Sequence, residues 1–175
     1  AVGGLIGGIL LTTWGGPKRK VNGVLMGMVL ISLFGVLLTG LGHDAYVWGL
    51  ASFFTLLMIP IINGSNQAIW QAKVAPDVQG RVFAARLLIA QISAPVAMLL
   101  GGFLADTVFE PAMSPGGILS SIFGGLVGTG PGAGMALMFI ITGMLGALIG
   151  LGGYAFRAVR DAEDILPDHE LANAA

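Results

Sequence analysis

The sequence predicts an all-α integral membrane protein, and three observations lead to that prediction. Apolar residues make up 55% of the 175 residues, whereas charged residues make up only 10%. The mean hydropathy is +0.90, and an ordinary soluble domain carries about 25% charged residues. The charges also divide the chain into uncharged blocks, most of which reach the ~20 residues that a helix needs to cross a bilayer.

Each uncharged block is expected to supply one membrane-spanning helix of a bundle over residues 1–160. The first block is expected to be a span whose beginning is missing. The last block is too long for one span, and its first half is too rich in Gly and Pro to be a span. The predicted spans are 1–16, 21–42, 45–70, 87–106 and 135–156, with an extracytoplasmic Gly/Pro-rich loop over 106–134 and a cytoplasmic tail over 161–175.

The basic residues fall at alternate connections between these predicted spans. They form three clusters: Lys18, Arg19 and Lys20; Lys73, Arg81 and Arg86; and Arg157 and Arg160. Short loops rich in Lys and Arg stay on the cytoplasmic side of a membrane. We therefore expect the first and third connections and the C-terminal tail to be cytoplasmic, which makes the polar segment 71–86 a cytoplasmic loop.

Small residues and prolines mark the helix faces that are expected to pack or bend. Glycines repeat at the spacing that lets two membrane helices approach closely. Two prolines inside predicted spans, Pro60 and Pro95, are expected to kink their helices. The glycine pairs are Gly3/Gly7, Gly4/Gly8 and Gly23/Gly27, and the last span carries the stripe Gly143, Gly146, Gly150 and Gly153.

Uncharged amides lie inside the third and fourth predicted spans. Asn63, Asn66 and Gln67 share one face of a helix, and Gln91 lies on the next span. Such amides either bond a neighbouring helix or line a polar pathway as the wall of a cavity, and the sequence leaves both open. Asp106, at the outer end of the fourth span, is the candidate mouth for an ion or proton.

Several classes of function are excluded or disfavoured by what the sequence lacks. The chain contains no cysteine, so it has neither disulfide nor thiol chemistry. It contains no catalytic or nucleotide-binding motif of the common types, and neither cofactor nor metal is expected. The basic residues are too few for a nucleic-acid partner. The expected partners are the lipid bilayer and a small-molecule substrate.

Several segments together resemble the major facilitator superfamily of transporters. The segments that carry the resemblance are WGGPKRK (14–20) and APDVQGRVFAAR (75–86), while GRVFAARLLIAQ, GGFLADTVFEPAM and EDILPD are similar to the branch of macrolide-efflux and enterobactin-exporter proteins. The resemblance implies helices eight to twelve of a twelve-helix bundle, thus part of its C-terminal six-helix half. It further implies a bacterial inner-membrane location and an N-terminal half elsewhere in the same protein.

The resemblance also implies a function and candidate gating residues. It implies a secondary transporter that exports small, largely apolar molecules such as macrolides by alternating access, as a proton-coupled antiporter. The loop residues that match the family's gating signature are Gly15, Lys18, Arg19, Asp77, Gly80 and Arg81. Thr12 stands where the family has an Asp. Asp77 and Arg81 could pair across a closed inner gate, or the basic residues could serve only to fix the topology.

Other functions remain open at this point. One is export of a siderophore or another metabolite by a protein of the same superfamily. Another is a small structural membrane protein that oligomerises through its glycine faces and transports nothing. An embedded enzyme would require His, Asp and Glu clustered at the membrane surface, and the sequence offers no such cluster.

Overall fold

The computed structural model describes residues 1–165, and every regular element in that range is helical. The longer helices are α1 (Val2–Trp14), α2 (Lys20–Leu30), α4 (Ala45–Lys73), α5 (Pro76–Leu104) and α8 (Ala133–Ala155). The shorter ones are α3 (Leu38–Leu41), α6 (Glu110–Met113), α7 (Ser120–Val127), α9 (Arg157–Arg160) and α10 (Ala162–Ile165). Two π-helical segments, η1 (Ile31–Leu37) and η2 (Ala105–Phe109), join α2 to α3 and α5 to α6.

Four helical stretches within this range are long and apolar enough to cross a membrane. They are Lys20–Leu41, Ala45–Lys73, Pro76–Met113 and Ala133–Ala155. A helix rises about 1.5 Å per residue, so about 20 residues cover the ~30 Å hydrocarbon core. Helix α1 is apolar but has only 13 residues. The predicted class, an all-α membrane protein, is confirmed.

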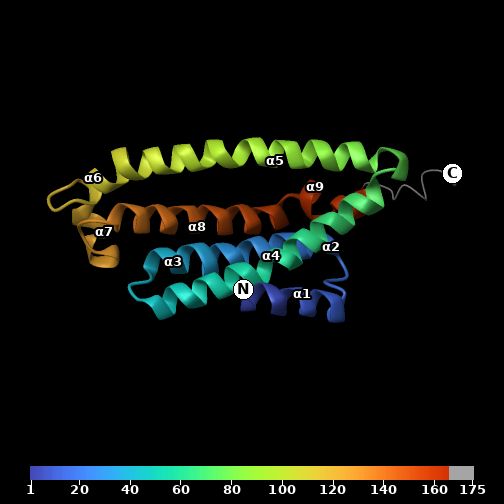
Figure 1. The fold of residues 1–175 in the computed structure, drawn as a ribbon, viewed down its shortest axis with the longest axis horizontal. Coiled ribbons are helices and arrows are strands. Elements are labelled where there is room, and N and C mark those ends of the chain that lie inside the picture. The colour runs from blue at the N-terminus through green and yellow to red at the C-terminus, as the bar shows by residue number, and fades with distance from the viewer. Residues whose placement is uncertain (166–175) are drawn as a thin grey trace.

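The long helices other than α5 pack side by side in the order α1, α4, α2, α8. Helix α4 lies between α1 and the continuous stretch α2–η1–α3, and that stretch packs on its other side against α8. Figure 1 shows these helices running roughly antiparallel along the long axis of the molecule. The connections after α1 and α4 and the segment after α8 therefore meet at one end, which we call the basic end because Lys18, Arg19, Lys20, Lys73, Arg81, Arg157 and Arg160 lie there.

Local chemistry explains where these helices begin and end. Helix α1 ends at Gly15, whose φ of 73° is a left-handed conformation that glycine adopts without strain. Helix α4 begins after Asp44, whose carboxylate accepts hydrogen bonds from the backbone N–H groups of Tyr46 (2.8 Å) and Val47 (3.0 Å). Helix α5 begins at Pro76, which is favoured in a first turn because that position needs no N–H donor.

Glycines form close contacts between neighbouring helices, as their spacing predicted, except at the pair Gly4/Gly8, where a Cβ atom would meet nothing closer than 3.8 Å. Gly3 and Gly7 lie against the α4 backbone at Phe53 and Leu57, so a side chain at either glycine would collide with a carbonyl group. On α8, the stripe of Gly143, Gly146, Gly150 and Gly153 faces α2 and η1. Gly143 and Gly150 lie against backbone atoms, whereas Gly146 and Gly153 lie against the side chains of Ser32 and Leu25. The absence of side chains lets the helix backbones approach and gain van der Waals contact that lipid cannot replace.

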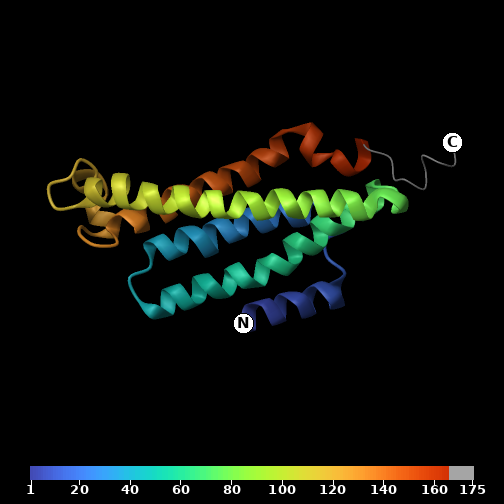
Figure 2. The same cartoon turned by 45° about the horizontal axis from the view of Figure 1, so that its top comes forward.

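Helix α5 stands apart from the other long helices. It has no buried residue, and its substantial packing contacts are with η2 at its own C-terminal end. Figure 1 shows α5 along one side of the bundle, and in Figure 2 it passes in front of the others. Its apolar side chains consequently face outward along most of its length.

Two segments differ from the expected loops. The polar segment 71–86 is mostly helical, because α4 continues to Lys73 and α5 begins at Pro76, which leaves a turn of two residues. The Gly/Pro-rich segment 106–134 contains η2, α6 and α7, and its Met113 and Val127 join a buried cluster with Leu137 and Ile140 of α8. Of the predicted tail, residues 166–175 lie outside the described range.

Candidate functional site

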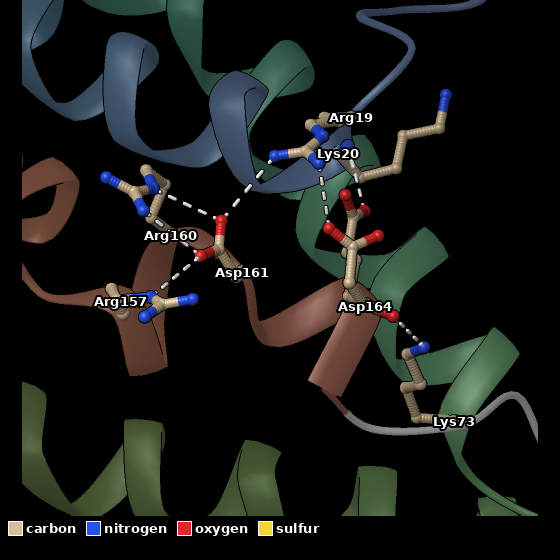
Figure 3. Close-up of polar contacts among 8 residues, drawn as sticks. Arg19, Lys20, Lys73, Arg157, Arg160, Asp161 and Asp164 are labelled. Atoms are coloured by element: carbon tan, nitrogen blue, oxygen red, sulfur yellow. Dashed lines mark hydrogen bonds and ion pairs between the residues drawn. The ribbon is translucent and has the colours of Figure 1, made fainter.

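A cluster of charged residues at the basic end connects elements that are far apart in the sequence (Figure 3). The chain leaves α8 at Phe156, whose extended backbone lets the short helices α9 and α10 fold back toward the start of α2. This turn places three acidic side chains beside the basic residues that follow α1. We call Arg19, Arg157, Arg160, Asp161, Glu163 and Asp164 the tail cluster.

Asp161 is the centre of the tail cluster. Its two carboxylate oxygens accept hydrogen bonds from Nε and a terminal nitrogen of Arg160, both at 3.1 Å. Arg19 approaches to 3.6 Å and Arg157 to 3.9 Å. The hydrogen bond from Arg160 is the main reason that the pKa of Asp161 lies below its ordinary value. Partial desolvation acts in the opposite direction, and the charges of the three arginines lower the pKa further. Asp161 is therefore ionised at neutral pH.

The remaining contacts fasten the tail to α2 and α4. Arg19 donates to a carboxylate oxygen of Asp164 at 2.8 Å, and the backbone N–H of Lys20 donates to Glu163 at 2.8 Å. The carboxylate of Glu163 thus caps the N-terminus of α2. On the other side, the Lys73 ammonium donates to the backbone carbonyl of Glu163 at 2.6 Å. One short helix accordingly joins the ends of three long helices.

Gly15, Lys18 and Arg19 are the predicted gating residues that follow α1. They lie close to the tail cluster, but of the three only Arg19 is part of it. Gly15 ends α1, and its carbonyl accepts a hydrogen bond from the Lys20 ammonium at 2.8 Å. Lys18 is exposed and has no hydrogen bond or ion pair to any residue in 1–165.

The predicted gating residues after α4 lie in the first turns of α5. Asp77 is in the first turn, where a negative charge is favourable, and Gly80 and Arg81 are exposed. No ion pair joins Asp77 and Arg81 in the described part of the chain. The turn is held instead by Gln79, whose amide donates to the carbonyls of Gln71 and Val74 at 3.1 and 2.8 Å. The gating role remains a prediction.

The residues predicted to line a polar pathway do not all lie in one cavity in the structure. Asn63 and Gln67 of α4 line a cavity of about 320 Å³ together with Phe83, Arg86, Leu87 and Ala90 of α5. Asn66 accepts a hydrogen bond from the indole N–H of Trp70 at 3.1 Å within α4. Gln91 is exposed and does not line this cavity. Asp106 lies in η2 at the end of the molecule opposite the basic end, where it is exposed.

Three features were not found from the sequence. The Arg86 guanidinium lies 4.4 Å from the centroid of the Trp70 ring, a cation–π contact between α4 and α5. The acids of the tail cluster carry no local signal, because their partner Arg19 is about 140 residues away in the chain. Glu110 accepts hydrogen bonds from the backbone N–H groups of Gly132 (3.0 Å) and Met135 (3.4 Å) and so caps α8. No local signal pointed to this cap, because Glu110 lies 22 residues before Gly132 in the chain.

The described residues contain no group of three or more His, Cys, Asp or Glu side chains that could hold a metal ion. The polar side chains available are amides, a guanidinium and exposed carboxylates. Such groups bind and orient ligands or form reversible ion pairs.

Comparison with known proteins gives a distant relationship. Over 112 residues, or 62% of this chain, the sequence is 28% identical to macrolide efflux protein A of Streptococcus pyogenes, and the same holds for that protein of S. pyogenes serotype M6. The aligned segment spans only 27% of the length of each relative. No family model matches the chain, and no solved structure matches it.

Proposed function

We propose that this chain is part of a membrane transporter that exports small, largely apolar molecules by alternating access. The observation that carries the proposal is the similarity to macrolide efflux protein A. The arrangement of the helices supports it, because α5 presents a long surface that no other described helix covers. In the proposed transporter, further helices of the same protein cover that surface.

The cavity between α4 and α5 is the proposed contribution to the substrate pathway. It combines apolar walls with the amides of Asn63 and Gln67 and one positive charge at Arg86. A few polar groups in an otherwise apolar cavity are typical of small-molecule sites, since they orient a ligand without demanding full hydration. Macrolides are the first cargo to test. Siderophores and other metabolites would use the same pathway.

The tail cluster and the α4–α5 turn supply the proposed switch at the basic end, which we place in the cytoplasm. Exposed ion pairs are individually weak, worth ~0–1 kcal/mol, so they form and break readily. We propose that the contacts of Arg19 with the tail hold one conformation and that Arg81 and Asp77 pair in another. Proton coupling through this chain would use Asp106, which lies in η2 within the membrane-length stretch Pro76–Met113.

Macrolide export from whole cells tests the proposal. Cells that lack their own exporters would express the complete gene, and accumulation of a radiolabelled macrolide would be measured. We expect lower accumulation than in cells with an empty vector, and a several-fold slower efflux for Arg81→Ala at equal amounts in the membrane. Arg81→Lys retains the charge and is the matched control for topology. Unchanged efflux by Arg81→Ala would refute the gating role, and absence of any efflux by the unmodified protein would refute macrolide export.

A further inference from the structure

A second cavity, of about 360 Å³, opens at the basic end between α1, α2 and α4. Its wall is mainly apolar and includes Met26 and Leu30 of α2 and Met58 and Ile61 of α4. Hydrogen-bond donors come from the Asn22 amide, the Tyr154 hydroxyl and the Trp14 indole. This size is within the ~300–1,000 Å³ range of small-molecule sites.

This cavity lies on the side of α4 that faces away from the proposed substrate pathway. Met58 and Gln67 are nine residues apart, which is 2.5 helical turns, so they project from opposite sides of α4. Gln67 lines the cavity shared with α5, whereas Met58 lines this one. The two cavities are therefore separate sites on one helix.

The polar and apolar parts of the cavity are arranged along α2. Asn22 lies in the first turn of α2 near the basic end, and Leu30 lies eight residues further on, about 12 Å along the helix axis. Trp14, which is 63% exposed, stands at the polar end. Tryptophan is enriched at the boundary between hydrocarbon and headgroups. A ligand that fits has a polar group at the surface and an apolar chain extending into the membrane.

The charge beside the cavity selects an anionic headgroup. Pro17 lines the cavity, and Lys18 follows it directly in the chain. Arg19 is engaged by Asp164 and Lys20 by the Gly15 carbonyl, whereas Lys18 has no such partner in residues 1–165. No carboxylate lines the cavity. Clustered Lys and Arg at the membrane surface attract anionic lipids.

We propose that this cavity binds one anionic phospholipid. Its acyl chain lies between Met26 of α2 and Met58 of α4, and its phosphate lies against Lys18. The Asn22 amide and the Trp14 indole donate hydrogen bonds to the phosphate or to the ester carbonyl groups.

Quenching of Trp14 by brominated lipids tests this site. A protein with Trp48→Phe and Trp70→Phe retains Trp14 as its only tryptophan, and it would be placed in bilayers containing phosphatidylglycerol or phosphatidylcholine with brominated chains. We expect apparent binding at Trp14 to favour phosphatidylglycerol by about fivefold, the effect of one nearby basic residue. A matched protein that keeps only Trp48, at the opposite end of the helices, is expected to show no preference.

Lys18→Gln is expected to abolish the preference, whereas Arg81→Gln removes one exposed positive charge at the same end and is expected to keep it. Equal quenching of Trp14 by the two lipids would overturn the proposal. Equal loss of the preference for phosphatidylglycerol in both variants would also overturn it, in favour of nonspecific attraction to the membrane surface. Competition by glycerol phosphate tests whether the acyl chain contributes to binding. If glycerol phosphate displaced the brominated lipid as strongly as lysophosphatidylglycerol does, the proposal would also be overturned. If the tryptophan substitutions prevent folding, native mass spectrometry of the unsubstituted protein, with and without Lys18→Gln, compares retention of the two lipids directly.

Discussion

The close approach of α8 to η1 at Gly143 allows a quantitative test of how the bundle is held together. Gly143 is buried, and a Cβ atom there would lie 2.7 Å from the backbone nitrogen of Leu37 and 2.8 Å from the carbonyl oxygen of Ser32. Both are backbone atoms, so neither can move aside by changing a side-chain rotamer. Gly152 lies on the same helix, and a Cβ atom there has no such neighbour within 4 Å.

The variants Gly143→Ala and Gly152→Ala therefore differ mainly in this overlap. Both gain the same helix propensity, about 1 kcal/mol, so the difference between their free energies of unfolding isolates the cost of the collision. Overpacking typically costs ~1–3 kcal/mol. At ~2–4 °C per kcal/mol for a chain of this size, Gly143→Ala should melt about 2–12 °C below Gly152→Ala.

Thermal unfolding in detergent, followed by tryptophan fluorescence, measures this difference. The two proteins have the same composition, so detergent binding and baseline effects cancel. Equal melting temperatures would show that α8 and η1 do not approach as closely as described. A lower melting temperature for Gly152→Ala would mean that a neighbour outside residues 1–165 packs on that face.

Three further outcomes follow from single side chains. Because the folded pKa of Asp161 is lowered, its contribution to holding the tail is present above its unfolded pKa of about 3.9 and is lost as the pH falls through the lowered value. The protection of the α10 amides against hydrogen exchange, corrected for the intrinsic rate at each pH, should thus stay constant from pH 7 to about 4 and fall below that, and Asp161→Asn should give low protection throughout. Ser65 is 1% exposed, and its hydroxyl has no hydrogen-bond partner in the described chain. Ser65→Ala should therefore leave the free energy of unfolding unchanged or raise it by about 1 kcal/mol. A clear decrease in the free energy of unfolding would reveal a partner of the hydroxyl. Glu110→Gln should lower the free energy of unfolding by roughly 0.5–1 kcal/mol, because it weakens the cap of α8. In chemical denaturation, high salt should reduce the difference between Glu110→Gln and the unmodified protein. A loss that does not depend on salt would assign the effect to packing.

The all-helical class and some of the packing faces were predictable because they depend on local chemistry. A run of apolar residues with no charge has few alternatives to a membrane helix, and glycine at Gly3 and Gly7 leaves a smooth surface wherever the partner helix lies. The helix ends were less predictable. The segment 71–86 was expected to be a loop because its charges mark the edge of the hydrocarbon, yet helices continue past that edge, and Pro76 begins a helix rather than a loop.

The candidate site was predictable only in part, since it depends on which helices become neighbours. The face shared by Asn63 and Gln67 follows from helical spacing, but its partner Arg86 depends on how α5 returns beside α4. The bond between Arg19 and Asp164 joins residues 145 positions apart. No local pattern encodes such a pair, because it arises only when the turn after Phe156 brings α10 back to α2.

Because α5 stands apart from the other long helices, its few polar side chains limit how it rotates about its own axis. Hydrocarbon solvates its apolar side chains equally well on every side, so they favour no rotational setting of the helix about its own axis. Ser93 satisfies its hydroxyl within the helix, on the Ile89 carbonyl at 2.7 Å. Gln91 has no such bond to any residue in 1–165. An amide that finds no partner in lipid favours the rotation that turns it toward a polar neighbour. Gln91 therefore adds to the contact between Arg86 and Trp70 in restricting how α5 rotates about its axis.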